Sequence, residues 1–336
     1  MKSYTVTAAN KTSPLELQEA PKPTAGPGEV VVKIKANSLN FRDGIVLKGG
    51  YPRNSQTPVV PASDMAGEVI EVGSGVKKFK VGDRVAANFM RDWHGGTLSE
   101  RVLWSSYGGG IDGFLAEYAP VPELSLVHIP KGLSFEEAST LPCAALTAWN
   151  GLTSAGLKAG DTILLLGTGG VSMFGLQFAK AFGANVIITS SSDEKLQKAR
   201  EFGADGTINY NTHPDWHLEV LRLTNGRGVD NVLEVGGAGT LERSLKSVRP
   251  GGTVSLIGLL TRVEHEPSML PVLLNAITIR GIYVGSREMF EEMNRAVEAN
   301  NLKPIIDRTF PFTEAQEAYT YFLSQSHVGK VVITQA

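Results

Sequence analysis

The stretch that most constrains the fold is ILLLGTGGVSMFGLQFAKAFG, in which three glycines stand between a strand-like run and a helix-like run. Gly167, Gly169 and Gly170 follow the apolar strand pattern Ile163–Leu166 and precede the helical pattern Val171–Phe182. Glycines permit a tight turn and close approach of the backbone to a pyrophosphate, and the helix N-terminus presents free N–H groups to it. We therefore interpret this loop as a dinucleotide-binding turn.

The match to the dinucleotide-binding fingerprint is imperfect, because its third position holds Ser172 rather than glycine or alanine. The alternative is an ordinary strand-to-helix turn, and the flanking pattern favours the nucleotide interpretation. From Ser134, where SFEE forms a capping box, strands alternate with helices, which predicts a parallel sheet covered on both faces. The further strands are expected at Val186–Thr189, VDNVLEVGG, GGTVSLIGLL and ITIRGIYVG, and the further helices at Glu194–Phe202 (capped by Ser191), LERSLKSV and MLPVLLNA.

The two ends of the chain have a different pattern. Up to about residue 124, β-branched runs such as GEVVVKIKANS, MAGEVIEVGSG and VGDRVAANF are separated by Gly and Pro, which predicts a compact β-barrel-like domain. After Gly285 follow the helix EMFEEMNRAVEAN, the strand IIDRTFPF, a helix opening at Thr313 with the capping box TEAQ, and the strand GKVVIT. This tail is typical of a return to the first domain. We expect domains at 1–123, 124–286 and 287–336, the first and last forming one discontinuous domain.

The end of the second expected strand carries information about the cofactor. In VIITSSSDEK the position where a carboxylate would hold the adenosine ribose is Ser190, with Ser191 beside it. A serine hydroxyl does not repel a 2′-phosphate and can donate to it. Lys195 can add a positive charge and Tyr210 can lie beside the phosphate, although both are also compatible with ordinary exposed positions. The missing acid favours NADP(H) over NAD(H).

Bulk properties exclude several classes of protein. The 336 residues carry a formal net charge of −2, which gives no electrostatic case for binding nucleic acid or a membrane surface. The single cysteine, Cys143, excludes a disulfide framework. The first residues lack the apolar core of a secretory leader, and no run is long enough to span a bilayer. We expect a cytoplasmic protein.

Along nearly its whole length the chain resembles the medium-chain dehydrogenase/reductase superfamily, with its alcohol dehydrogenase and quinone oxidoreductase fold. The stretches that carry the resemblance are GEVVVKIKANSLNFRDG, AGEVIEVGSGVKKFKVGDRV, GGIDGFLAEY, ASTLPCAALTAWNGL, GTGGVSMFGLQFAKAFGA and GKVVI. It implies an α/β protein with a doubly wound Rossmann domain in the middle and a GroES-like barrel domain formed by both chain ends, with a substrate cleft between them. It also implies a homodimer paired through VSLIGLL or ITIRGIYVG at the sheet edge. Further cofactor contacts that it implies are Thr147, Thr168, Val171, Gly236, Ile257, Gly258 and Lys330.

The departures from the superfamily concern its zinc ions. Zinc-dependent members have a cysteine where this chain has Asn40, a His-Glu pair where it has Ser63 and Asp64, and a third ligand where it has Cys143. One thiol with an amide, a hydroxyl and a carboxylate is a poor catalytic zinc site, and residues 88–115 lack the four cysteines of a structural zinc lobe. We expect a zinc-free member, in which Cys143 is a small helix residue left at a former ligand position.

Without a Lewis acid, reducing a polarised C=C bond is easier than oxidising an alcohol, because the developing enolate needs only hydrogen-bond donors and a proton. By resemblance, Asn40 and Tyr51 line the cleft as donors. Asp43 forms an orienting ion pair with Arg42, and Asp64 supports the site from behind. Each of these residues is alternatively a fixer of loop geometry.

Two segments are expected to set the substrate, the loop Arg91–Tyr107 and Leu259–Leu270. Trp93, Trp104 and Tyr107 are compatible both with an aromatic wall and with barrel packing. Three functions remain open: an NADPH-dependent reductase of quinones or α,β-unsaturated carbonyls, an NADP-dependent alcohol dehydrogenase or carbonyl reductase, and an NADPH-binding protein without turnover.

Overall fold

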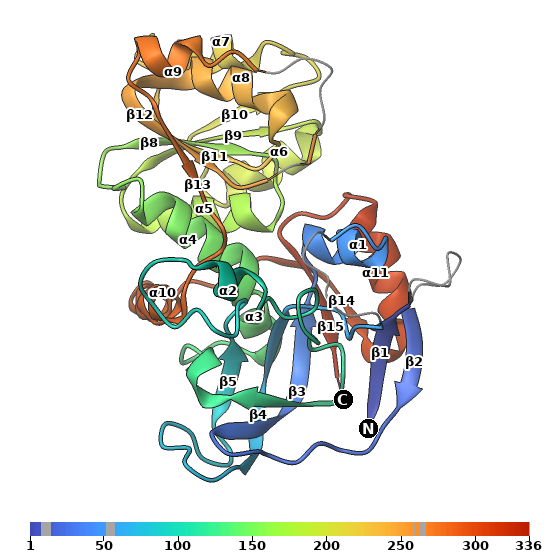
Figure 1. The fold of residues 1–336 in the computed structure, drawn as a ribbon. Coiled ribbons are helices and arrows are strands. Elements are labelled where there is room, and N and C mark those ends of the chain that lie inside the picture. The colour runs from blue at the N-terminus through green and yellow to red at the C-terminus, as the bar shows by residue number, and fades with distance from the viewer. Residues whose placement is uncertain (8–14, 52–57, 259, 262–266, 336) are drawn as a thin grey trace. The chain divides into compact units, whose positions relative to one another are not determined.

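The computed structural model describes residues 1–7, 15–51, 58–258, 260–261 and 267–335. The chain forms two compact units, the first made of Met1–Leu146 with Gly285–Ala336 and the second of Thr147–Val284 (Figure 1). Half of the expected segment Leu259–Leu270, namely 259 and 262–266, lies outside the described residues. The boundary near residue 124 falls later than the sequence pattern indicated, because residues 126–128 extend the sheet of the first unit.

The second unit is a parallel sheet with helices on both faces, as predicted. Its strand order is β10-β9-β8-β11-β12-β13. The strands are β8 (Thr162–Leu166), β9 (Asn185–Ser190), β10 (Gly206–Asn209), β11 (Val229–Glu234), β12 (Val248–Leu256) and β13 (Thr278–Gly281), and the helices are α4 (Leu146–Thr153), α5 (Gly170–Ala181), α6 (Asp193–Glu201), α7 (Trp216–Leu223), α8 (Ala238–Ser247) and α9 (Leu270–Leu274).

Close packing explains how the helices lie on this sheet. Glycines in α4 and α5 contact the sheet directly, since an added Cβ would lie 2.8 Å from a methyl of Leu233 at Gly151 and 2.9 Å from one at Gly175. The opposite face is covered by buried side chains of α7 and α8, including Trp216 and Leu245. Burial on both faces accounts for the apolar strands of this half of the chain.

The strand order reverses direction between β8 and β11, which lie side by side in parallel. In open α/β sheets the ligand crevice forms at such a switch point, outside the carboxyl ends of the strands. The loop with Gly167 and Gly169 follows β8, and the loop with Gly236 follows β11. The topology therefore places both loops at the nucleotide-binding edge of the sheet.

The first unit contains a mixed sheet in the order β14-β15-β3-β4-β5-β7, with β6 paired to β3, and a separate β1-β2 hairpin. The strands are β1 (Lys2–Val6), β2 (Leu15–Glu19), β3 (Glu29–Ser38), β4 (Asp64–Val72), β5 (Arg84–Ala87), β6 (Tyr118–Pro122), β7 (Leu126–His128), β14 (Ile306–Pro311) and β15 (Lys330–Thr334). The helices are α1 (Phe41–Leu47), α2 (Glu100–Leu103), α3 (Phe135–Ser139), α10 (Arg287–Ala299) and α11 (Ala315–Leu323), with a π-helical turn, η2, at Leu141–Ala145.

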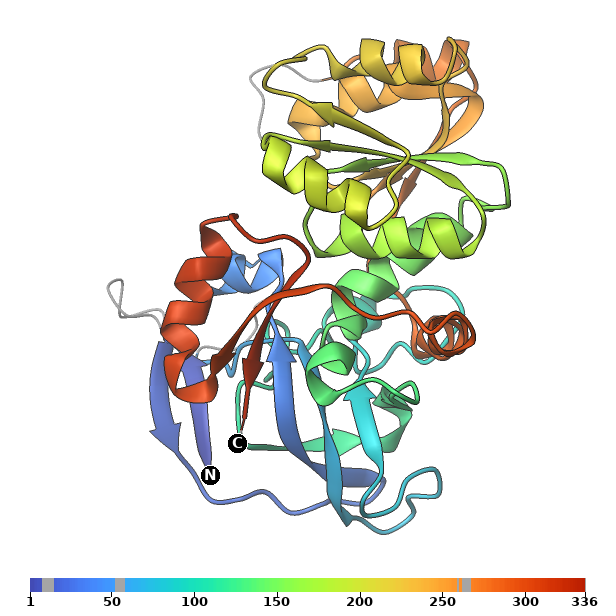
Figure 2. The ribbon, with the colours of Figure 1, turned by 180° about the vertical axis from the view of Figure 1, so that it is seen from behind.

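The end of the chain closes this first unit. Strand β15 pairs antiparallel with β3, so that Val332 lies opposite Ser38. Figure 2 shows the red closing strand beside a blue strand from the first part of the chain. Side chains from both ends of the sequence, such as Leu39 and Tyr319, share one buried cluster. The return of the tail to the first part of the chain is the arrangement that the sequence pattern indicated.

Several local expectations differ from the structure. Ser134 and Glu137 form the predicted capping box. The cap of α6 is Ser192, whose Oγ accepts from Lys195 N, rather than Ser191. The capping box at Thr313 does not form, because a 3₁₀ turn over Phe312–Glu314 precedes α11 and takes that residue out of the cap position.

Strand β12, which contains the first three residues of VSLIGLL, lies inside the sheet between β11 and β13. Its backbone is therefore already paired on both sides, and the expectation of a free edge there is wrong. Strand β13, from ITIRGIYVG, is an edge of the sheet.

Among the described residues, no helix is long and apolar enough to cross a membrane.

Candidate active site

The glycine loop has the form that a pyrophosphate site needs. Gly167 directly follows β8 and has a φ of 72°, in the region that favours glycine. Gly169 is the N-cap of α5 and contributes no side-chain cap hydrogen bond. A Cβ added at Gly167 or Gly169 would meet no atom within 4 Å, so the space above the loop is open. The first amides of α5 are thus available to an anion, and Thr168, Gly170 and Val171 lie in the same turn.

Ser172 explains the departure from the fingerprint. It is 1% exposed, and its Oγ donates to the carbonyl oxygen of Leu166 at 2.7 Å. The hydroxyl therefore turns back onto the end of β8 and stays away from the open side of the loop. A small residue with an inward hydrogen bond meets the requirement for close packing that glycine or alanine meets elsewhere.

The residues predicted to surround the ribose come from neighbouring strand ends. Ser190 closes β9 and is buried, and its carbonyl accepts from Tyr210 N at 3.0 Å. Ser191 is exposed in the next position, and its carbonyl accepts from Asn211 Nδ2. The nearest following carboxylate, Asp193, lies in the first turn of α6 and accepts from Asn209 Nδ2 at 2.8 Å. The structure brings Ser190, Ser191 and Tyr210 together and leaves the strand end without an acid.

Glu234 is a residue of this edge that the sequence analysis missed. It ends β11 and is fully buried, and its Oε1 accepts from the amides of Gly236 (2.8 Å) and Gly237 (2.9 Å) and from Thr240 Oγ1 (2.6 Å). Its Oε2 accepts from Ser244 Oγ. One carboxylate therefore fixes the loop that contains Gly236. The only sequence signal was a single acid at the end of an apolar strand.

Two of the remaining predicted cofactor residues of the second unit, Ile257 and Gly258, lie at the same edge. The amides of Ile257 and Gly258 both donate to the carbonyl of Glu234, which holds the end of β12 to β11. A Cβ at Gly258 would lie 1.9 Å from the carbonyl oxygen of Val235, so only glycine fits there. Thr147 and Thr168 are 3% and 4% exposed.

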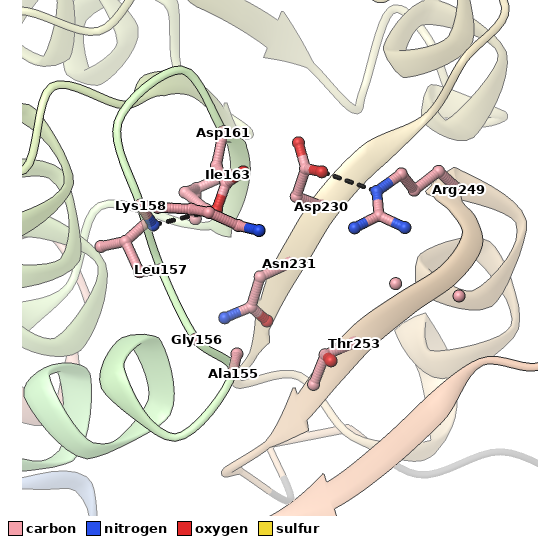
Figure 3. A pocket seen from close by; sticks show the side chains of 12 residues that line it. Ala155, Gly156, Leu157, Lys158, Asp161, Ile163, Asp230, Asn231, Arg249 and Thr253 are labelled. Carbon is pink, nitrogen blue, oxygen red and sulfur yellow. Dashed lines mark hydrogen bonds and ion pairs between the residues drawn. The ribbon is translucent and has the colours of Figure 1, made fainter.

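A pocket of about 230 Å³ lies at the opposite end of this sheet, at the amino ends of β8 and β11 (Figure 3). Asp230 lines it and pairs with Arg249, with 2.6 Å between Oδ1 and Nε. Burial alone would raise the pKa of Asp230, but hydrogen bonds from Arg227 and Arg249 hold it well below its usual range. Because nucleotides bind at the carboxyl ends of such strands, we do not assign this pocket to the cofactor.

In the first unit, polar residues gather where β3 leads into α1. Asn40 is the N-cap of α1, and its backbone N–H donates to Asp43 Oδ2 at 2.8 Å. Asp43 is fully buried and lies 3.6 Å from Arg42 Nη2. Burial, opposed by Arg42, raises the pKa of Asp43 to about 6. The pair that the resemblance implied is thus present.

The guanidinium of Arg42 lies over two aromatic rings. Its Cζ lies 5.1 Å from the ring centre of Tyr51 and 4.6 Å from that of Phe89, and Nη2 donates to the carbonyl of Tyr107. The hydroxyl of Tyr51 is 3.2 Å from Ser106 Oγ. Among the described residues, no hydrogen-bond partner is found for Arg42 Nε and Nη1 or for Asn40 Nδ2, although these atoms are buried. This region therefore holds unused hydrogen-bond donors.

Lys330 and Asp64 form the inner side of the same cluster. Lys330 is 2% exposed, and its Nζ donates to Leu39 O and to Asn40 Oδ1, both at 2.6 Å. Asp64 accepts from Ser38 Oγ at 3.0 Å and from Ser63 Oγ at 2.8 Å, and its Oδ2 lies 3.9 Å from Lys330 Nζ. Four of the predicted site residues, Asn40, Asp43, Asp64 and Lys330, thus belong to one buried polar cluster.

The donor set of this cluster does not fit a catalytic zinc ion. Asn40 already turns its only oxygen acceptor to an ammonium, and Asp64 is bonded to two hydroxyls. Cys143 is the single thiol of this donor set, whereas catalytic zinc usually takes histidine or several cysteines. In the ranges that the structure describes, no three His, Cys, Asp or Glu side chains converge to hold a metal ion.

The loop Arg91–Tyr107 divides between core and surface. Tyr107 belongs to a buried cluster of the first unit, and its hydroxyl lies 3.1 Å from Ser125 Oγ. Trp93 is 6% exposed and donates from Nε1 to the carbonyl of Gly96 at 3.0 Å. Trp104 is 46% exposed. Barrel packing therefore accounts for Tyr107, and only Trp104 presents a large aromatic surface.

The raised pKa of Asp43 predicts a pH dependence of stability. Because the folded-state value of about 6 exceeds the unfolded value of 3.8, the folded protein binds a proton more tightly than the unfolded chain. Stability from this group is present below about pH 4 and decreases as the pH rises to about 6, by at most about 3 kcal/mol. The variant Asp43→Asn should remove this slope in urea unfolding measured between pH 4 and 6.5.

The exposed Asp112 provides a matched control, since Asp112→Asn removes a carboxylate of the same unit from a solvent-exposed position. This variant should follow the wild-type slope. A pH profile of Asp43→Asn that parallels the wild type would show that Asp43 does not titrate in this window.

Comparison with known proteins agrees with this architecture. Residues 26–131 match the family model described as "Alcohol dehydrogenase GroES-like domain", and residues 170–299 match "Zinc-binding dehydrogenase". A zinc-type alcohol dehydrogenase-like protein of Schizosaccharomyces pombe is 48% identical over 91% of each chain. A 2-methylene-furan-3-one reductase of Solanum lycopersicum is 33% identical over 99% of this chain and 79% of its own.

Among solved structures, one described as an NAD-dependent alcohol dehydrogenase superposes with a TM-score of 0.90. It is 36% identical and the match covers 99% of both chains. The chain therefore matches these proteins in its two units, in the order of the units along the chain and in sequence. The chain belongs to the medium-chain dehydrogenase/reductase superfamily, as an alcohol dehydrogenase-like oxidoreductase.

Proposed function

We propose that this protein is a zinc-independent reductase that uses NADPH to reduce quinones or α,β-unsaturated carbonyl compounds. The observation that carries the proposal is the set of buried donors on Arg42 and Asn40 that have no hydrogen-bond partner within the described part of the chain. When bound, NADPH supplies the hydride. The residues of this chain have to stabilise the negative charge that then develops on the substrate oxygen, and hydrogen-bond donors are sufficient for an enolate.

The donors come with the features that such a role needs. The Asn40 amide is neutral, and the Arg42 guanidinium lies over the rings of Tyr51 and Phe89. Buried donors interact with a developing oxyanion more strongly than donors in water. The phenol of Tyr51, next to Arg42, is the proposed proton source, with Asp43 orienting Arg42 from the other side.

The cofactor assignment rests on the end of β9. NADPH carries a 2′-phosphate that a carboxylate at position 190 would repel, whereas the hydroxyls of Ser190 and Ser191 can donate to it. We propose that Lys195 and Tyr210 complete this phosphate site, and that the glycine loop with α5 holds the pyrophosphate. Thr147, Gly236, Ile257 and Gly258 would position the rest of the cofactor along the carboxyl edge of the sheet.

The relatives support two related activities. 2-Methylene-furan-3-one is a conjugated ketone, so the tomato relative is named for the chemistry proposed here. The NAD-dependent alcohol dehydrogenase supports the second candidate, alcohol oxidation or carbonyl reduction. The second candidate has to stabilise an alkoxide, for which the first unit offers the Arg42 guanidinium but no fitting metal site among its described residues.

Product analysis separates the two candidates. The protein would be incubated with NADPH and either but-3-en-2-one, 1,4-benzoquinone or benzaldehyde, with and without a chelator, and the products identified by mass spectrometry. We expect the saturated ketone and the hydroquinone, at rates that the chelator does not change. Benzyl alcohol as the main product, lost on chelation, would instead establish a metal-dependent carbonyl reductase.

We further propose a homodimer formed through strand β13. This strand is an edge of the sheet, and the preceding α9 exposes Leu273 and Leu274, at 77% and 71%. Large exposed apolar side chains next to an edge strand are typical of a contact surface. A second copy of the chain covers both features at once, because two edge strands can pair around a two-fold axis.

The double substitution Leu273→Asp/Leu274→Asp is expected to convert the dimer to a monomer in light scattering at micromolar concentration. Two carboxylates buried at such an interface would have to be desolvated without a partner. Leu218→Asp, which changes a leucine on α7 that is 57% exposed, is the matched control and should leave the dimer intact. A wild-type monomer would refute this proposal.

A further inference from the structure

We infer that Lys330 is a positioning residue, whose ammonium fixes which end of the Asn40 amide is available as a donor. This inference rests on the proposed function, because it concerns how the same site is prepared for a substrate oxygen. It differs from the role that the resemblance implies for Lys330, which is direct contact with the cofactor.

The Lys330 ammonium contacts two oxygen atoms. Lys330 Nζ lies 2.6 Å from Asn40 Oδ1 and 2.6 Å from the carbonyl oxygen of Leu39. An ammonium can donate but not accept, whereas the Asn40 side chain has one accepting and one donating end. Only the oxygen can therefore face Lys330. The lysine thus selects one of the two orientations of the amide, the same one that the capping-box contact with the Asp43 backbone N–H favours.

The orientation of the Asn40 oxygen also fixes where the Nδ2 group of the same amide points. With Oδ1 directed to Lys330, the Nδ2 group points to a different side, where it has no hydrogen-bond partner among the described residues and is buried. A buried donor without a partner is costly and is uncommon in folded proteins. Here the lysine prevents the amide from turning to relieve that cost. Asn40 Nδ2 is thus kept ready for an oxygen that is supplied from outside.

Lys330 is itself held in place by its surroundings. Its side chain is 2% exposed, and its backbone N–H donates to Ile305 O. Asp64 lies 3.9 Å from the ammonium and is fixed by the hydroxyls of Ser38 and Ser63. Moving this buried ammonium away from Asp64 and the two accepting oxygens would leave a buried charge without compensation, which is strongly unfavourable. The closing strand β15 therefore places the Lys330 ammonium at the start of α1.

The alternative role of Lys330 is direct binding of a cofactor phosphate. A lysine that binds a cofactor phosphate needs an ammonium that is accessible to that phosphate. The contacts of this ammonium are instead directed to Leu39, Asn40 and Asp64, all within the first unit. Positioning predicts an effect on kcat, whereas a phosphate contact predicts an effect on the Kd for NADPH.

The experiment compares Lys330→Met, Asn40→Asp and the double variant. Turnover is measured with but-3-en-2-one at saturating NADPH, and the NADPH Kd by fluorescence titration. Asn40→Asp keeps an oxygen for Lys330 but removes the donor. Each single variant should reduce kcat about 100-fold, the typical cost of losing one oxyanion donor, with the Kd within about twofold of the wild type. The double variant should be no slower than Asn40→Asp, because both changes remove the same donor.

Three further variants complete the design. Lys330→Arg keeps the charge and should recover kcat to within about tenfold of the wild type. Lys303→Met removes an exposed lysine of the first unit and should leave kcat and Kd unchanged. Should Lys330→Met not fold, Lys330→Gln takes its place with the same expectations. An unchanged kcat with a tenfold higher NADPH Kd, or losses that multiply in the double variant, would overturn the inference.

A readout independent of turnover separates this inference from the proposed function. In protein labelled with ¹⁵N at asparagine side chains, the NH₂ signal that is absent from Asn40→Asp belongs to Asn40. It should shift or double in the Lys330 variants and stay in place in Lys303→Met. A wild type that reduces neither the enone nor the quinone refutes the proposed function alone, whereas an Asn40 signal that ignores Lys330 refutes the positioning role.

Discussion

Replacing Ser190 with aspartate is expected to weaken NADPH binding about 100-fold and to make NADH the better cofactor. Ser190 ends β9 and is 4% exposed, so a carboxylate there would stand in a partly desolvated position. Two negative charges about 4 Å apart repel each other by about 4 kcal/mol near a protein surface, and 2.7 kcal/mol corresponds to a factor of about 100. The same carboxylate would accept hydrogen bonds from the free ribose hydroxyls of NADH.

The cofactor prediction is checked by titrating both nucleotides against intrinsic fluorescence. Ser190→Asn has the size of aspartate without its charge and serves as the matched control. We expect it to lower NADPH affinity by less than about tenfold, since only a hydroxyl contact is exchanged. If Ser190→Asp bound NADPH as tightly as the wild type, the 2′-phosphate could not be located at this strand end.

Replacing Glu234 with alanine is expected to lower the free energy of unfolding by about 3–5 kcal/mol. The carboxylate accepts hydrogen bonds from the amides of Gly236 and Gly237 and from the hydroxyls of Thr240 and Ser244. Because Glu234 is fully buried, alanine would leave these donors unpaired in a dry environment. The loop after β11 should loosen, and NADPH affinity should fall with it.

Urea unfolding of Glu234→Ala measures this cost, with Glu242→Ala as the matched control. Glu242 lies on α8, which follows the same loop, and forms an exposed pair with Lys246. Exposed pairs of this kind contribute less than about 1 kcal/mol. A Glu234→Ala variant no less stable than Glu242→Ala would show that the loop does not depend on this carboxylate.

Much of the fold can be predicted from the sequence, because the signals for strands, turns and helix caps are local and recur along the chain. The run ILLLG predicts β8 and the turn at Gly167, and the capping box at Ser134 predicts the start of α3. Alternation of apolar strands and helices predicts the covered parallel sheet of the second unit. These features depend on neighbouring residues, which a single sequence displays.

The features that the sequence analysis missed depend on contacts between distant residues. Glu234 is a lone acid on an apolar strand, and only the folded loop shows the four donors around it. Lys330 meets Asn40 only because β15 pairs with β3, so the sequence gives no sign of this contact. The cap of α6 was displaced by one residue, since Ser191 and Ser192 are equivalent by type and only backbone geometry distinguishes them.

The proposed function requires NADPH as the cofactor and an enone or a quinone as the substrate. The most direct measurement is kcat/KM for NADPH and NADH, side by side, in the reduction of but-3-en-2-one and 1,4-benzoquinone by protein treated with a chelator. We expect NADPH to be preferred by at least about tenfold, corresponding to a difference of about 1.4 kcal/mol in transition-state binding. A preference for NADH, or loss of turnover on chelation, would contradict the proposed zinc-independent NADPH reductase.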